Sequence, residues 1–83
     1  MTKQEILRMC DHTVLRTDAP FSEISENCAL AIKYNCASMC LAPGHVYEAK
    51  KFCGEKLKIC TVVGFPNGYN DTATKVFEAK HLI

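Results

Sequence analysis

Apolar positions recur at two spacings along this chain, and each spacing predicts a different kind of element. Ile24, Cys28, Ala31 and Ile32 follow the i, i+4, i+7, i+8 spacing of one helical face. We expect a helix over this stretch, with Ser22 as its N-cap.

Caps and apolar stripes predict three more helices. Thr2 and Glu5 form a capping box in front of a short helix. A second helix covers residues 45–52 and stops at Gly54, and a third covers residues 71–83. The positions expected to face inward on these last two helices are Val46, Ala49, Phe52 and Cys53, then Ala73, Val76, Phe77 and Ile83.

Short apolar runs at 10–15, 36–41 and 58–63 predict three strands between the helices. Crossovers of this length indicate parallel strands with right-handed connections, so the predicted fold class is α/β. Continuous apolar strands are typical of a sheet buried on both faces. Ligand sites in such folds lie in the loops after the strands, which makes residues 64–68 a candidate small-molecule site.

The chain of 83 residues makes at most one domain. Three parallel strands leave two unpaired edges, and the helix over 71–83 lacks a Gly, Asn or Pro that would end it. We therefore expect residues 1–83 to be part of a longer fold.

Composition excludes several classes of function. A formal charge of +1, from 10 Lys and Arg against 9 Asp and Glu, leaves no basic cluster for nucleic acid. No apolar run approaches the length of a membrane span, and the N-terminus lacks the apolar core of a signal peptide. We expect a cytoplasmic protein.

The six cysteines, which lie in apolar stretches, are expected to be mostly small buried hydrophobes, and no set has the spacing of metal ligands.

Three strand segments and one helix together resemble deoxyribose-phosphate aldolase. They are residues 11–15 (DHTVL), 37–43 (ASMCLAP), 61–68 (TVVGFPNG) and 72–80 (TATKVFEAK). The resemblance implies that residues 1–83 are the N-terminal part of a single (β/α)8 TIM-barrel domain, with a leading helix and three βα units. It also implies a homo-oligomeric class I aldolase that needs no metal or organic cofactor. Such an enzyme reversibly cleaves 2-deoxyribose 5-phosphate to glyceraldehyde 3-phosphate and acetaldehyde through a lysine Schiff base.

The same resemblance places five residues at the substrate pocket: Asp11, Thr13, Leu15, Cys40 and Phe65. Asp11 and Thr13 would hold substrate hydroxyls or a catalytic water, although a buried Asp bound by strand-end amides is also consistent with the sequence. Cys40 is either a reactive thiol near the products or an inert buried cysteine.

Neighbouring positions have more ordinary interpretations. His12 points to the opposite face, where a packed, hydrogen-bonded histidine is favoured over a catalytic base. His45 and His81 are expected on solvated helix faces, and Gly64 and Gly68 are expected to allow unusual backbone angles around Pro66.

No residue of this chain is assigned a catalytic role. A Schiff-base lysine must be desolvated or lie beside another cation, whereas the eight lysines lie on polar helix faces or at strand starts. The family's two lysines and its assisting aspartate fall on later strands, so we expect the isolated chain to be inactive. Two other functions remain open from sequence: a self-associating structural fragment, and a phosphosugar-binding module without Schiff-base chemistry.

Overall fold

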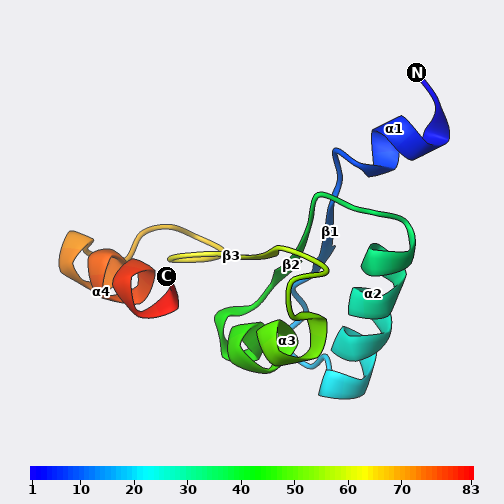
Figure 1. Ribbon diagram of the computed structural model, residues 1–83. Helices are drawn as coiled ribbons and strands as arrows, with labels where there is room; N and C mark the ends of the chain where they lie inside the picture. Colours follow the sequence, from blue (N-terminus) through cyan, green and yellow to red (C-terminus); the bar gives the residue numbers. More distant parts are fainter.

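The computed structural model describes residues 1–83 and contains three parallel strands with helices between them (Figure 1). The elements are, in order, α1 (Lys3–Leu7), β1 (Asp11–Val14), α2 (Phe21–Lys33), β2 (Ser38–Leu41), the 3-10 turn η1 (Pro43–His45), α3 (Val46–Cys53), β3 (Ile59–Thr61) and α4 (Thr72–Leu82). The predicted number, order and type of strands and main helices are confirmed.

The sheet has the order β1-β2-β3, so β2 pairs on both sides. Asp11 pairs with Ser38, Thr13 pairs with Cys40, and Cys40 in turn pairs with Cys60. Because successive side chains alternate between the two faces of a strand, these five residues share one face. All of β2 is buried, whereas β1 alternates between exposed and half-buried positions, so the prediction of a sheet buried on both faces holds only for its centre.

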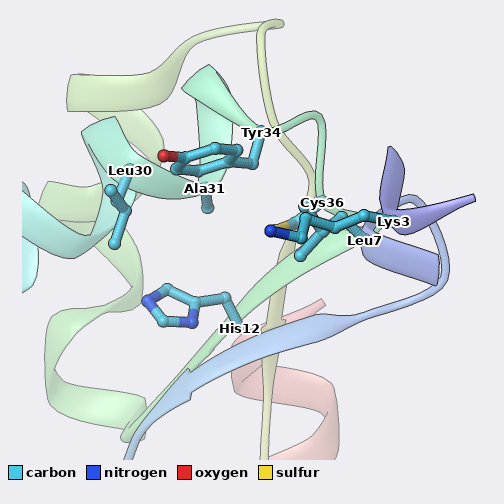
Figure 2. Close-up of a pocket in the computed structure, with 7 residues that line it drawn as sticks. All are labelled: Lys3, Leu7, His12, Leu30, Ala31, Tyr34 and Cys36. Atoms are coloured by element: carbon cyan, nitrogen blue, oxygen red, sulfur yellow. The ribbon is translucent and has the colours of Figure 1, made fainter. Parts of the chain in front are cut away.

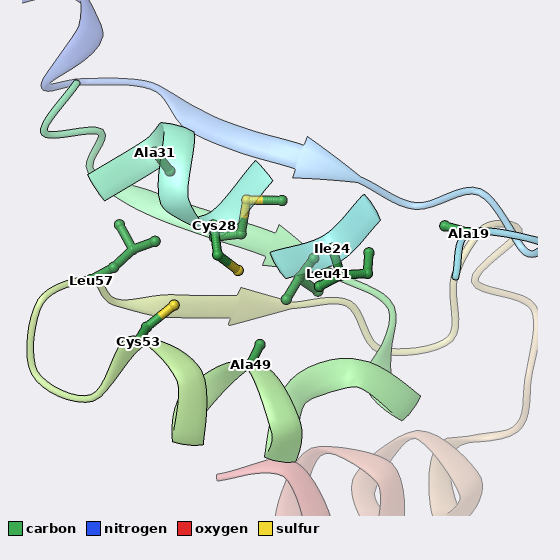
Figure 3. Packing of buried hydrophobic residues seen from close by; sticks show 9 residues of the cluster. Ala19, Ile24, Cys28, Ala31, Leu41, Ala49, Cys53 and Leu57 are labelled. Carbon is green, nitrogen blue, oxygen red and sulfur yellow. The ribbon is translucent and has the colours of Figure 1, made fainter. Parts of the chain in front are cut away.

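The core lies between the sheet and the layer of α2 and α3 (Figure 3). Met39 and Leu41 reach it from β2, Ile24 and Cys28 from α2, and Ala49 from α3, all with no exposed surface. Its remaining members are Ala19, Ala31, Cys53 and Leu57. The predicted stripe on α2 is confirmed at Ile24, Cys28 and Ala31, and Ile32 packs against its edge.

Local chemistry explains where two of the helices begin. The hydroxyl of Thr2 accepts from the Glu5 backbone N–H at 3.2 Å, as the capping box predicts. Helix α2 begins one residue before the predicted N-cap Ser22, because the extended Pro20 takes the N-cap position without a side-chain bond. Arg16 holds this start by two bonds, of 2.7 and 2.8 Å, to the carboxylate of Glu23. The Arg16 guanidinium lowers the pKa of that carboxyl below its ordinary value of 4.5.

Helix α4 departs from its predicted packing. It lies beside β3, apart from the layer of α2 and α3 (Figure 1), and none of its residues is buried. Val76 and Phe77, expected to face inward, are 45% and 74% exposed, and Ile83 is fully exposed. On α3, Phe52 is likewise half-exposed, although Ala49 and Cys53 are inward as predicted. An amphipathic spacing indicates which side chains share a face, but a partner surface must be present to cover them.

Leu41→Ala should strongly destabilise the fold, since removing a fully buried leucine side chain costs about 2–5 kcal/mol. Leu30→Ala is the matched control, because Leu30 is 44% exposed and its truncation should cost less than about 0.5 kcal/mol. Urea unfolding followed by circular dichroism measures both. Equal midpoints for the two variants would contradict the assignment of Leu41 to the core.

Candidate functional site

The sheet face opposite α2 and α3 forms the floor of the candidate site. It carries the five residues that pair across the strands: Asp11 and Thr13, Ser38 and Cys40, and Cys60. Three of them carry oxygen-bearing polar side chains and two carry thiols. No helix of the chain lies over this face, because α2 and α3 pack on the other one (Figure 1).

Asp11 and Ser38 are joined across the first two strands. The Ser38 hydroxyl donates to Asp11 Oδ1 at 2.7 Å, and the Thr13 hydroxyl donates to the Asp11 carbonyl oxygen at 2.7 Å. Asp11 itself is exposed, so the interpretation of a buried carboxylate bound by strand-end amides is wrong. Ser38 was missed from sequence, although it lies two residues before Cys40 and therefore had to share its face.

The rim of the site is a hollow of about 250 Å3 at the carboxyl ends of the strands. Leu15 follows β1, and Phe65 belongs to the loop after β3. The other lining residues are Thr17, Ala42, Pro43, Val62, Pro66 and Glu78. The structure thus places two of the predicted pocket residues, Leu15 and Phe65, at the same hollow.

The five predicted site residues lie at three levels along the strands. Asp11 is the first residue of β1 and Leu15 follows its last, so the two are four positions apart, roughly 13 Å along an extended strand. Thr13 and Cys40 lie in register between the levels of Asp11 and Leu15. The geometry is a polar floor that leads up to a largely apolar rim.

The loop after β3 is held by backbone angles and by α4. Gly64 and Gly68 have φ values of 65° and 72°, which confirms the predicted need for glycine. The Gly64 N–H donates to Glu78 Oε1 at 2.8 Å, and the Lys75 ammonium donates to the Gly68 carbonyl oxygen at 3.1 Å. No spacing in the sequence indicated that Glu78 would reach back to this loop.

Cys40 is not activated as a thiolate nucleophile, and His12 is hydrogen-bonded to a helix. Burial, and then the neighbouring Cys60 thiol, raise the pKa of Cys40, which keeps it protonated near neutral pH. His12 Nε2 lies 2.9 Å from Asn27 Oδ1, and since an amide oxygen only accepts, the imidazole N–H donates there. This contact confirms the expected packed histidine on the helix side of the sheet.

The other two histidines differ from each other. His45 lies in η1, half-buried and tilted against the ring of Phe21 with 6.5 Å between ring centroids, so its expected solvation is wrong. His81 is exposed on α4, as predicted.

A separate apolar hollow of about 330 Å3 lies on the helix side of the sheet (Figure 2). Its lining comes from α1, β1, α2 and the turn before β2: Lys3, Leu7, His12, Leu30, Ala31, Tyr34 and Cys36. None of the predicted pocket residues reaches it, so it is distinct from the candidate site.

The floor and the rim contain neither a set of metal ligands nor a desolvated lysine. No group of three or more His, Cys, Asp or Glu side chains has an arrangement that could hold a metal ion. Seven of the eight lysines are exposed, and the half-buried Lys75 is bonded to Gly68. No helix is long and apolar enough to cross a membrane.

Comparison with solved structures defines the class of this fold. The chain superimposes on a structure described as a putative deoxyribose-phosphate aldolase from Coccidioides immitis, with a TM-score of 0.92 and 34% identity, covering 99% of this chain and 33% of the other. A tetrameric deoxyribose phosphate aldolase from Aeropyrum pernix, at 22% identity, shares the fold alone, with a TM-score of 0.91. The chain has the arrangement of the N-terminal part of a TIM-barrel aldolase, with an open sheet.

Sequence comparison gives the family. A family model described as DeoC/LacD family aldolase matches residues 6–83, so the chain belongs to that family. It is 45% identical over 80 residues to a deoxyribose-phosphate aldolase of Clostridioides difficile, and 45% identical over 83 residues to one of Streptococcus pyogenes. The chain spans 36% and 37% of these relatives, little more than a third of their length. The resemblance noted in the sequence is confirmed.

Glu78→Ala should loosen the loop after β3. A hydrogen bond to a charged group contributes about 1.5–3 kcal/mol, so the Gly64 amide should exchange with solvent at least about tenfold faster. Glu78→Gln keeps an acceptor oxygen at the same reach and should retain most of the protection. Hydrogen exchange of the Gly64 amide, followed by NMR, measures both. Unchanged exchange in the alanine variant would show that this bond does not hold the loop.

Proposed function

We propose that this chain forms one wall of the active site of a deoxyribose-phosphate aldolase. The reaction would be the reversible cleavage of 2-deoxyribose 5-phosphate to glyceraldehyde 3-phosphate and acetaldehyde through a lysine Schiff base. The family match and the relatives at 45% identity support this assignment. The observation that carries the site is the polar floor, where Asp11 and Ser38 are bonded on a sheet face that no helix covers.

The floor suits a substrate rich in hydroxyl groups. Asp11 Oδ1 accepts from Ser38, which leaves the other carboxylate oxygen available as an acceptor. The Thr13 hydroxyl donates its proton to the Asp11 carbonyl oxygen, so the lone pairs of the hydroxyl remain available as hydrogen-bond acceptors. Asp11 and Thr13 would therefore receive hydrogen bonds from substrate hydroxyls or a catalytic water. Leu15, Phe65 and Cys40 would shape the wall and exclude solvent.

The nucleophile is proposed to lie outside residues 1–83. A lysine that forms a Schiff base must be neutral near pH 7, which requires burial or a neighbouring cation. No lysine of this chain is among the residues of the floor or the rim. The family's lysine pair and aspartate, carried on later strands, would supply that chemistry in a full-length enzyme. The chain alone is therefore proposed to be inactive.

A trapping experiment with a chimera tests the function. The matching 80-residue segment of the Clostridioides difficile enzyme is replaced by this chain, and the chimera and the isolated chain are treated with acetaldehyde and borohydride before peptide mass spectrometry. We expect a lysine adduct and cleavage of 2-deoxyribose 5-phosphate by the chimera, and neither by the isolated chain.

Control variants distinguish an effect on the proposed wall of the active site from a loss of folding. Asp11→Ala in the chimera should lower kcat/KM for 2-deoxyribose 5-phosphate by at least about tenfold, since losing a charged acceptor costs about 1.5–3 kcal/mol. Exposed Glu55, which belongs to neither the floor nor the rim, serves as the matched site for an alanine control. A specific adduct on a lysine of the isolated chain would contradict the proposed inactivity. A folded but inactive chimera would contradict the proposed wall.

Self-association of the chain is a second candidate, favoured by its exposed apolar surface. Phe77 and Tyr69 are 74% and 81% exposed, and both β1 and β3 present unpaired edges. Burying these groups against a second copy would cover surface that the monomer leaves in water.

Light scattering after size exclusion tests this candidate. We expect a mass above that of one chain, and we expect Phe77→Asp to shift it towards the monomer because a charge is costly in an apolar contact. Thr72→Asp, at another exposed position of α4, is the matched control and should change nothing. A monomer at all concentrations would exclude self-association.

A further inference from the structure

Six cysteines are free in this chain, and two of them are direct neighbours across the sheet. Cys40 of β2 and Cys60 of β3 are register partners in the parallel pairing of the two strands. Their side chains therefore leave the sheet on the same face and at the same height. Neither is needed by the core, which lies on the opposite face.

We propose that Cys40 and Cys60 are a redox-active dithiol, which a peroxide oxidises to an intramolecular disulfide between β2 and β3. The proposal does not rest on the proposed aldolase function, because it depends only on the pairing of the strands. It identifies a modification site on the polar floor for a small oxidant of the hydroperoxide class.

The backbone spacing is compatible with the bond. Neighbouring strands lie about 4.8 Å apart, and disulfides join Cα atoms that are about 4.4–6.8 Å apart. Cys60 is half-buried and Cys40 is 9% exposed, so peroxide would meet Cys60 first. Burial and the neighbouring Cys60 thiol also raise the pKa of Cys40, which lowers its thiolate fraction, so that Cys40 itself reacts slowly with peroxide.

The chemistry balances in two steps. Peroxide transfers one oxygen atom to the Cys60 sulfur, giving a sulfenic acid and one water. The Cys40 sulfur then attacks the Cys60 sulfur, the S–S bond forms, and the sulfenic oxygen leaves as a second water with the Cys40 proton. Together the two thiols lose two protons and two electrons, and the peroxide is reduced to water.

The other cysteines provide internal comparisons. Cys28 and Cys53 face each other in the core (Figure 3), but they are 0% and 2% exposed, so an oxidant cannot reach them in the folded chain. Burial, with the neighbouring Cys53, also raises the pKa of Cys28 to about 12. Cys10 donates its thiol proton to the Ile6 carbonyl oxygen, and it pairs with no cysteine in the register of the sheet.

Peptide mapping of the oxidised chain tests the proposal. The folded chain is treated with hydrogen peroxide in small excess, its remaining thiols are alkylated, and it is digested with trypsin without reductant. We expect peptide 34–50, which holds Cys36 and Cys40, to be joined to peptide 59–75, which holds Cys60. The linkage should disappear on treatment with dithiothreitol.

Variants identify the sulfurs. Cys36→Ala should keep the linkage and Cys60→Ala should abolish it, each with the circular dichroism spectrum of the unmodified chain. The map of the wild-type chain decides the question even if Cys60→Ala does not fold. The proposal is overturned by sulfinic acids at Cys40 or Cys60 without a linkage, by intermolecular bonds alone, or by a Cys28–Cys53 bond as the main product.

Discussion

The central strand β2 is the constraint on which the rest of the structure depends. It pairs with β1 and β3, and all four of its residues are buried. Met39 and Leu41 point into the core under α2 and α3, while Ser38 and Cys40 point to the open face. Because the side-chain period of a strand is two, a slip of one residue would exchange these faces and destroy the core and the floor together. Packing and site are therefore fixed by the same register.

Contacts around β2 reinforce that register on the side of β3. The Met39 N–H donates to the Lys58 carbonyl oxygen at 2.9 Å, and the Thr61 hydroxyl donates to the Leu41 carbonyl oxygen at 2.7 Å. These bonds bracket the pairing of Cys40 with Cys60. The register of β2 and β3 is thus fixed on both sides of the paired thiols, although β3 is short and its other edge is unpaired.

Much of this architecture could be predicted from sequence because its signals are local or periodic. The capping box at Thr2, the stripe from Ile24 to Ala31 and the glycine at position 54 each depend on a few neighbouring residues. The predictions that proved wrong, such as the inward face of α4, required knowledge of distant surfaces. The same limit applies to the site: the shared face of Ser38 and Cys40 follows from alternation, but the reach of Glu78 to Gly64 depends on where α4 lies.

The open face also explains why the proposed wall of an active site can be recognised although the chain supplies no Schiff-base lysine. In a (β/α)8 barrel the inward residues of all strands meet around one axis, so each strand contributes only part of a site. Three strands here supply acceptors, thiols and an apolar rim, which are groups that bind and shape. A Schiff-base lysine needs neighbours on several sides to exclude water and lower its pKa. An open sheet leaves one side to solvent, and this is the physical basis of the proposal that the chain alone is inactive.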